Sequence, residues 1–287
     1  MDDNHPIEAP RVAFQGELGA YSDEAVRLFF GAAAEPVPCR DFDAVGERTT
    51  AGEVDYGLLP IENSLAGSVV PSYDVLSSTD LAVVGEIVCP IHHCVLAAPG
   101  AAEAGLRRVL SHPVALAQCR RWLAAHPGVE VVSWYDTAGA AKTIAAEGDL
   151  ATAAIAGRLA AERYGLQVIE EHVEDRPDNQ TRFLVVARAG APLPRPPADS
   201  SSGMTTALLA ETANAPGALL RLLQPFAERG VNLTKLESRP AEQPWSYRFF
   251  LEIDGGAELS PVREALADAH ENSASLRVLG SYPRWLA

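Results

Sequence analysis

The first part of the chain, residues 1–188, alternates short apolar runs with segments of helical periodicity. Short apolar runs bounded by glycine, proline or polar residues predict buried strands. Apolar residues three and four positions apart predict helices, as at Leu116, Cys119 and Leu123. Strands that alternate with helices predict an α/β architecture with mainly parallel strands. The predicted strands are 11–14, 54–60, 81–88, 109–110, 129–133, 151–155, 166–169 and 181–187, and the predicted helices are 22–30, one from 113, 137–146 and one ending at Gly165.

The second part follows a different order. Strands are predicted at 205–212, 232–238, 247–253 and 275–281, with helices at 216–229 and 260–270. This βαββαβ order is the ferredoxin-like split motif. Residues 189–204 separate the two parts and are rich in proline and then serine, which is typical of a linker.

Composition and charge exclude several classes of protein. The net charge of −15 argues against a nucleic-acid-binding protein, and residues 1–188 alone carry −13, from 14 basic and 27 acidic side chains. No uncharged apolar run is long enough to predict a membrane span, and the acidic start does not resemble a signal peptide. The four cysteines lack zinc-finger or CxxC spacing, so we expect free thiols in a reducing cytoplasm.

Three segments place polar residues where a binding site would need them. Residues 60–64 (PIENS) follow an apolar strand directly. Residues 179–183 (NQTRF) enter the last strand, where Thr181 offers a hydroxyl and Arg182 a planar fork for a carboxylate. Residues 16–22 (GELGAYS) lead into a helix, and helix N-termini attract anions. A turn, an exposed arginine or a plain helix start explains each segment equally well.

Histidines and cysteines at positions 89–94 raise the question of a metal. Adjacent residues on a strand point to opposite faces, so His93 and Cys94 would diverge. We therefore predict no metal site. In the second part, residues 214–220 (NAPGALL) join a strand to a helix, and residues 237–240 (ESRP) close a later strand. Amides at that helix start suit the carboxylate of a small amino acid, although two ordinary loops are the alternative.

Taken in order, these segments resemble the prephenate dehydratase family with a C-terminal ACT regulatory domain. The resemblance covers about residues 11–283 and also includes residues 111–119 and 153–155. It implies a catalytic domain at 10–188 with two α/β lobes, similar to type II periplasmic binding proteins, and an active site in the cleft. A linker at 189–204 and a ferredoxin-like βαββαβ ACT domain at 205–283 would follow.

The resemblance implies decarboxylation and dehydration of prephenate to phenylpyruvate in phenylalanine biosynthesis, without metal or cofactor. Because aromatisation drives the reaction, the protein need only orient the dianion and help the hydroxyl leave. Thr181 matches the family's essential threonine, and we expect it to donate a hydrogen bond or relay a proton to that hydroxyl. Arg182 is expected to pair with a carboxylate and Phe183 to pack the pocket wall. The other residues expected to bind substrate are Ala20, Tyr21, Ser22, Glu62, Asn63, Ser64, Ser111, Gln118 and Thr137.

For the second domain, the resemblance implies pairing between subunits, in a homodimer or homotetramer, and phenylalanine as feedback inhibitor. No nucleic-acid or membrane partner is expected. The residues expected to contact the effector are Asn214, Pro216, Gly217, Ala218, Leu219, Leu220, Glu237, Ser238, Arg239 and Pro240.

Two departures from many bacterial members keep alternatives open. Residues 136–140 (DTAGA) and Gln15 look like plant arogenate dehydratases, and arogenate bears an amine where prephenate bears a keto group. Asp136 suits an ammonium group and suits a helix N-cap equally well. Val114 stands where glutamine is frequent, which weakens any role for that position only. We favour prephenate, with arogenate as the alternative substrate. A non-catalytic amino-acid-sensing binding protein is the remaining alternative.

Overall fold

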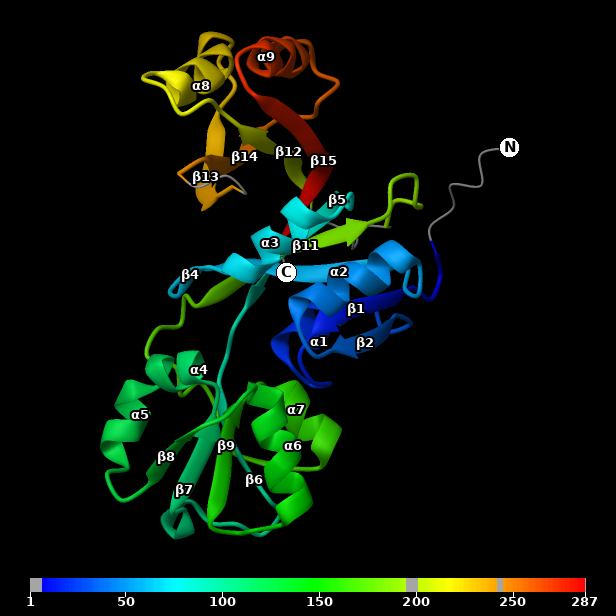
Figure 1. Cartoon of the computed structure of the whole chain (residues 1–287). Helices are drawn as coiled ribbons and strands as arrows, with labels where there is room; N and C mark the ends of the chain where they lie inside the picture. Colours follow the sequence, from blue (N-terminus) through cyan, green and yellow to red (C-terminus); the bar gives the residue numbers. More distant parts are fainter. Residues whose placement is uncertain (1–6, 195–200, 242–244, 287) are drawn as a thin grey trace.

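The protein is described by a computed structural model for residues 7–194, 201–241 and 245–286. Figure 1 shows two α/β lobes and a C-terminal domain, with lobe 1 in the middle. Short strands rich in Val, Ala and Leu form the buried centre of lobe 1, and helices cover its sheet. Lobe 1 holds β1 (Arg11–Gln15), α1 (Tyr21–Phe30), β2 (Glu35–Cys39), α2 (Phe42–Ala51), β3 (Tyr56–Asn63), β4 (Gly67–Ser68), α3 (Val70–Ser78), β5 (Ala82–Pro90) and β11 (Gln180–Ala187).

Lobe 2 is inserted into lobe 1 between β5 and β11, so the chain crosses between the lobes twice, at residues 91–93 and 171–179. Its five-stranded sheet has the order β10-β6-β9-β7-β8. Its elements are β6 (Cys94–Ala97), the 3-10 helix η1 (Glu103–Gly105), β7 (Arg108–Ser111), α4 (Pro113–Gln118), α5 (Arg120–Ala125), β8 (Glu130–Ser133), α6 (Thr137–Glu147), β9 (Thr152–Ala156), α7 (Arg158–Tyr164) and β10 (Gln167–Glu170).

The C-terminal domain has the predicted βαββαβ order. Its elements are β12 (Ser201–Glu211), α8 (Ala218–Glu228), β13 (Leu233–Pro240), β14 (Tyr247–Asp254), α9 (Ser260–Glu271) and β15 (Ser275–Leu286). Both helices lie on one face of the sheet, where Leu222 and Phe226 of α8 pack against Leu208 and Leu251. The two-lobed α/β architecture with this domain at its end confirms the predicted fold class.

The C-terminal domain is joined to lobe 1 by both backbone and side chains. β15 pairs in parallel with β5, which makes one ten-stranded sheet of order β13-β14-β12-β15-β5-β11-β3-β1-β2, with β4 on β3. On the face away from its helices, Phe250 and Tyr282 share a buried core with Tyr73 and Leu76 of α3. Gly280 permits the close approach, because a Cβ there would lie 1.9 Å from the carbonyl oxygen of Val83. The two parts are therefore coupled mechanically.

Several sequence-based boundaries differ from the structure. β2, α2, α3 and β6 were not predicted, and the helix predicted from residue 113 is broken at Cys119 into α4 and α5. The sheets are mixed, because β11 runs antiparallel to both β3 and β5. β12 begins at Ser201, inside the predicted linker, and residues 195–200 lie outside the described part. Among the described residues, each helix is too short or too polar to cross a bilayer.

Candidate active site

A cavity of about 700 Å³ lies between the two lobes, a size suited to a small molecule. Lobe 1 contributes the start of α1, the ends of β1 and β3, and the start of α3. Lobe 2 contributes α4 and the first residue of α6. The strand β11 contributes Thr181 and Phe183, and further parts of the wall come from Arg40, Asp41 and Phe42 before and in α2 and from Ile91 and His93 in the first crossing. Of the residues predicted to act on substrate, Tyr21, Ser22, Asn63, Gln118, Thr137, Thr181 and Phe183 line this cavity.

The Thr181 hydroxyl is oriented by a cross-strand neighbour. Thr181 on β11 pairs with Asn63 on β3, and Asn63 Nδ2 donates to Thr181 Oγ1 at 2.9 Å. The Asn63 amide cannot be reversed, because its Oδ1 accepts from the amides of Leu65 and Ala66 at 3.0 and 2.9 Å. Thr181 therefore accepts a hydrogen bond, and within the described part its own hydroxyl proton has no protein acceptor. That proton is available to a molecule in the cavity.

A chain of hydrogen bonds connects this pair to lobe 2 and back to α1. Gln118 Nε2 donates to Asn63 Oδ1 at 3.4 Å, and Gln118 Oε1 accepts from Asn179 Nδ2 at 3.1 Å. The same oxygen lies 2.9 Å from His93 Nε2, and His93 Nδ1 lies 2.6 Å from the Tyr21 hydroxyl. With a hydrogen on Nε2 alone, His93 donates to Gln118 and accepts from Tyr21. With hydrogens on both ring nitrogens, it donates to both partners, and the Tyr21 hydroxyl donates to the carbonyl oxygen of His92 at 3.0 Å. Both lobes thus share one polar network.

Two helix N-termini from opposite lobes meet at the cavity. α1 begins at Tyr21, and its N-cap Ala20 has no side chain able to cap the first amides, which are left for a ligand. α6 begins at Thr137, and Asp136 Oδ1 accepts from the Gly139 amide at 2.7 Å. The positive ends of these helix dipoles favour an anion between them.

Five of the predicted substrate residues do not line the cavity, and three of them lie in its supporting walls. Ser111 is fully buried, and its hydroxyl donates across the sheet to the carbonyl oxygen of Ile155 at 2.6 Å. Ser64 donates to the carbonyl oxygen of Asp178 at 3.1 Å, which ties together the ends of β3 and β11. Ala20 has no polar side chain and lies behind the first turn of α1. These residues support the walls of the site.

Arg182 and Glu62 differ most from expectation, because the structure places both away from the cavity. Successive strand residues point to opposite faces, so Thr181 and Arg182 cannot both face the substrate. Arg182 lies 3.0 Å from Glu86 and 2.7 Å from Glu252 of the C-terminal domain. Glu62 lies 3.5 Å from Arg182 and 2.9 Å from Lys235. The strand that presents Thr181 to the cavity therefore presents its next residue to the C-terminal domain.

Sequence reasoning missed His93 and Asn179 as parts of the site. His93 was considered only as a metal ligand, and Asn179 lies in the NQTRF segment without an assigned role. Both lie in the segments that cross between the lobes, and this position is the signal that could have identified them. Burial lowers the pKa of His93, which favours the neutral ring near pH 7.

A second polar cluster holds the two crossing segments together. Possible ligand atoms of His92, His172 and Glu174 lie within 4.8 Å of one another. Glu174 is already engaged, because its Oε1 lies 2.8 Å from His92 Nδ1 and its Oε2 accepts from the His93 amide at 2.9 Å. Although burial opposes it, these hydrogen bonds keep the pKa of Glu174 below its ordinary value. The cluster thus already has a structural role, beside the network residue His93.

The predicted effector residues divide into two groups. Leu220 is 67% exposed on α8, and Ser238 and Pro240 are exposed on β13. Glu237 and Arg239 instead face lobe 1, where Glu237 accepts from the Ser68 hydroxyl at 2.6 Å and Arg239 lies 3.7 Å from Asp74.

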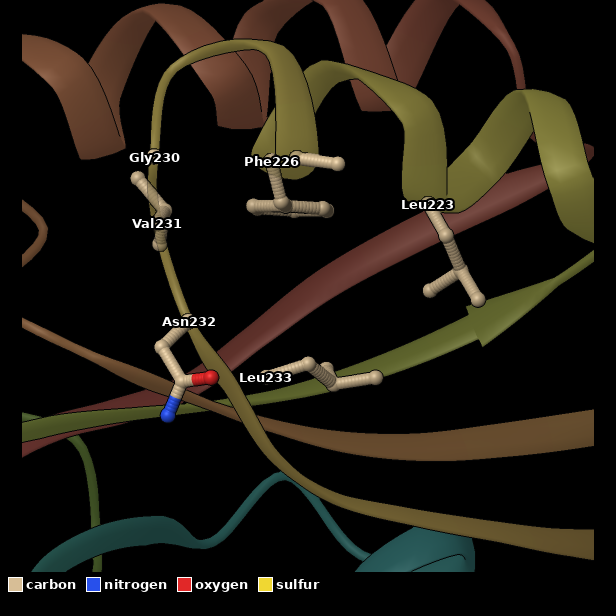
Figure 2. A pocket seen from close by; sticks show the side chains of 7 residues that line it. Leu223, Phe226, Gly230, Val231, Asn232 and Leu233 are labelled. Carbon is tan, nitrogen blue, oxygen red and sulfur yellow. The ribbon is translucent and has the colours of Figure 1, made fainter.

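A separate cavity of about 480 Å³ opens at the C-terminal end of α8 (Figure 2). Leu223 and Phe226 reach into it from the helix, and Asn232 and Leu233 line it from the following loop and strand. Asn232 is its one polar side chain, and none of the predicted effector residues lines it. This cavity is therefore separate from the residues that were predicted to bind the effector.

A cleft between two α/β lobes, lined by an oriented hydroxyl and two helix N-termini and joined to a βαββαβ domain, defines a two-lobed small-molecule-binding protein as the class. The family model for prephenate dehydratase matches residues 12–191, and the model for the ACT domain matches residues 206–271. The chain belongs to the prephenate dehydratase family.

Similar proteins carry both substrate names. A bifunctional chorismate mutase/prephenate dehydratase of Pseudomonas aeruginosa is 37% identical over 97% of this chain and 74% of its own length. Arogenate dehydratase/prephenate dehydratase 2, a chloroplastic protein of Arabidopsis thaliana, is 40% identical over 95% of this chain and 72% of its own length. These relatives support a dehydratase without deciding its substrate.

Two solved structures share nearly the whole fold. A prephenate dehydratase from Arthrobacter aurescens in complex with L-Phe has a TM-score of 0.85, with 35% identity over 95% of this chain and 89% of that chain. A protein described as GqqA, a novel type of quorum quenching acylase, has a TM-score of 0.86, with 37% identity over 96% of this chain and 98% of that chain.

Proposed function

We propose that this chain converts prephenate to phenylpyruvate, carbon dioxide and water in phenylalanine biosynthesis. The observation that carries the proposal is the Thr181 hydroxyl, whose proton the bond from Asn63 leaves free at the cavity wall. A departing hydroxyl needs a donor of this kind. Both lobes contribute to the same wall, so closure around a ligand would remove it from water.

Two bonds break in the reaction. The bond between the ring carbon and its carboxylate breaks, carbon dioxide leaves, and the electron pair enters the ring. The carbon–oxygen bond across the ring breaks in turn, and the departing hydroxyl takes a proton and leaves as water. We assign Thr181 the hydrogen bond or proton relay to that oxygen, with solvent restoring the proton. Aromaticity provides the driving force, so the protein's task is orientation and proton supply.

The substrate dianion needs positive partners, and Arg182 faces away from the cavity. We infer that the first amides of α1, at Tyr21 and Ser22, hold one carboxylate and that the N-terminus of α6 at Thr137 faces the other. Helix dipoles act locally, so they can bind an anion within a strongly acidic domain.

We favour prephenate over arogenate because of Asp136. This side chain is engaged as the N-cap of α6, and burial raises its pKa above the ordinary value. A carboxyl that is already engaged as a helix cap is a poor partner for the ammonium group of arogenate. Arogenate remains the alternative, and the relatives carry both names.

The test compares both substrates on one preparation, following phenylpyruvate from prephenate and phenylalanine from arogenate. We expect the higher kcat/KM with prephenate. We also expect Asp136→Asn to leave the ratio of the two kcat/KM values within about twofold, because a cap of either kind satisfies the helix. A selective loss of arogenate turnover in that variant would assign Asp136 to the ammonium and reverse the preference.

The likeness to a described acylase calls for a control reaction. Acyl transfer usually needs a hydroxyl or thiol nucleophile beside a base. Within the described residues, no serine, threonine or cysteine of the cavity is hydrogen bonded to a histidine ring. We therefore expect no hydrolysis of an N-acyl amide under conditions in which prephenate is consumed.

His93 predicts the acid limb of the pH profile. Burial lowers its pKa, and protonation would place hydrogens on both ring nitrogens, so that the Tyr21 hydroxyl would have to turn from Nδ1 to the carbonyl oxygen of His92 at the cavity wall. A histidine whose pKa is lowered by folding favours the native state at a pH above its ordinary pKa. This contribution to stability is lost as the pH falls toward the lowered pKa. We expect kcat to be level from about pH 8 to about pH 6.5 and to decline below that range. A decline that begins above neutrality would contradict this assignment.

We also infer that phenylalanine binds the ACT domain as a feedback inhibitor, and that these domains pair in a homodimer or homotetramer. Large exposed side chains on this domain support pairing, including Leu220 and Leu236, with Trp245 81% exposed. The four cysteines are unpaired and buried, as suits a reducing cytoplasm.

A further inference from the structure

Two successive residue pairs of β3 and β11 serve the two faces of one sheet. On the cavity face, Asn63 on β3 is paired with Thr181 on β11 and donates to it. On the opposite face, the next pair in the register is Glu62 with Arg182, whose charged groups are 3.5 Å apart. Any displacement of the second pair therefore moves the backbone that carries the first.

The second pair belongs to a group of six charges that we call the charge junction. Three ion pairs cross from lobe 1 to the ACT domain: Arg182 to Glu252 at 2.7 Å, Glu62 to Lys235 at 2.9 Å, and Glu86 to Arg284 at 3.6 Å. Arg182 also lies 3.0 Å from Glu86 within lobe 1. The members of the charge junction are Glu62, Glu86, Arg182, Lys235, Glu252 and Arg284.

The charges of the two sides are complementary. Lobe 1 contributes two carboxylates and one guanidinium to the junction, and the ACT domain contributes two cations and one carboxylate. The exposed fractions of the Arg182, Glu252 and Lys235 side chains are only 16%, 10% and 12%. Buried ion pairs tolerate little change in geometry, because each charge lacks water as a substitute partner. The junction is therefore suited to transmit small displacements.

Two further contacts run beside the junction along β13. Every second side chain of β13, at Lys235, Glu237 and Arg239, faces lobe 1. Glu237 accepts from the hydroxyl of Ser68, which lines the cavity. The hydroxyl of Tyr282 is buried near Glu86 and Glu252, without a hydrogen-bond partner among the described protein atoms. An unsatisfied buried hydroxyl is a polar group that a second arrangement of this interface can satisfy.

We propose that the charge junction transmits the state of the ACT domain to the active site, with Arg182 and Glu62 as positioning residues for Thr181 and Asn63. This inference rests on the proposed function for its readout. It assigns the arginine of the NQTRF segment to regulation, whereas the threonine beside it serves the reaction. Coupling of this kind typically changes affinity or rate by 5- to about 150-fold.

The test uses two full-length variants altered only on the ACT side, Glu252→Gln and Lys235→Met. Glu258→Gln is the matched control, because Glu258 is an exposed glutamate of the same domain outside the junction. Thermal melting first establishes that each protein is folded. Three quantities are then measured: phenylalanine affinity by calorimetry, kcat/KM with and without saturating phenylalanine, and hydrogen exchange of residues 180–187 with and without phenylalanine.

We expect both junction variants to bind phenylalanine within about threefold of wild type. We expect the effect of phenylalanine on kcat/KM, and on exchange in β11, to shrink at least about fivefold in them and to persist in Glu258→Gln. Undiminished effects in both junction variants would overturn the inference. If wild type turned over neither substrate, the proposed function would fail, and the exchange comparison alone would decide the inference. If wild type bound no phenylalanine, the effector proposal and the inference would both fail.

Discussion

Thr181→Ala is expected to reduce kcat for prephenate by about two to three orders of magnitude, as loss of one oriented transition-state donor typically does. The expected loss is large because Thr181 accepts from Asn63 and so presents its proton to the cavity in one direction. The alanine variant leaves the cavity, the helix N-termini and the polar network through Gln118 in place. Substrate binding should therefore change much less than turnover, which steady-state kinetics separates as kcat and KM.

Thr181→Ser and Thr181→Val separate the hydroxyl from the shape of the side chain. Serine keeps a hydroxyl that Asn63 can orient, so we expect it to retain most of the activity. Valine keeps the shape without the hydroxyl and should resemble alanine. A folded Thr181→Ala protein with nearly full turnover would remove Thr181 from the mechanism, and valine more active than serine would do the same.

Arg182→Met is expected to lower the free energy of unfolding by about 3–5 kcal/mol, the usual cost of removing one partner from a buried ion pair. Its guanidinium bridges Glu86 and Glu252, whose side chains are 5% and 10% exposed. Without it, Glu252 loses this cationic partner, and Glu86 keeps the longer contact to Arg284 at 3.6 Å. Urea denaturation measures the loss, and Arg176→Met serves as the control because Arg176 is exposed and, within the described residues, pairs with the equally exposed Asp178.

The pH dependence of that loss has a defined sign. Burial raises the pKa of Glu86, and Arg182 opposes this rise, so its removal raises the pKa further. When the pKa of a carboxyl is higher in the folded than in the unfolded state, the folded protein loses stability as the pH rises toward the folded pKa. The deficit of Arg182→Met should therefore be smaller at about pH 5.5 than at about pH 7.5. A variant of wild-type stability with only a raised KM would instead return Arg182 to the substrate.

The division of the fold was predictable from periodicity, but its assembly was not. The βαββαβ order of the C-terminal domain follows from residues 205–281 with boundaries close to those observed. The pairing of β15 with β5 had no local signal, because the sequence of residues 284–286 does not specify a partner strand. β2 and α3 carry prolines and serines that weaken strand and helix patterns, and their packing in lobe 1 decides their conformation.

The candidate site shows where a motif is less informative than strand geometry. The NQTRF segment pointed to both Thr181 and Arg182, yet alternation along β11 allows only one of them to face the cavity. The same rule separates Asn63 from Glu62 in the PIENS segment. Gln118, by contrast, contacts Asn63, and His93 contacts Gln118, only because the lobes approach each other, which no local pattern reveals.

The most direct test of the account is to mix catalytic amounts of the purified protein with prephenate and to quantify phenylpyruvate and carbon dioxide together. The account predicts equal amounts of both products over many turnovers, with no metal or cofactor added. A folded protein that binds prephenate and returns it unchanged would contradict the assignment of this cavity as a dehydratase active site.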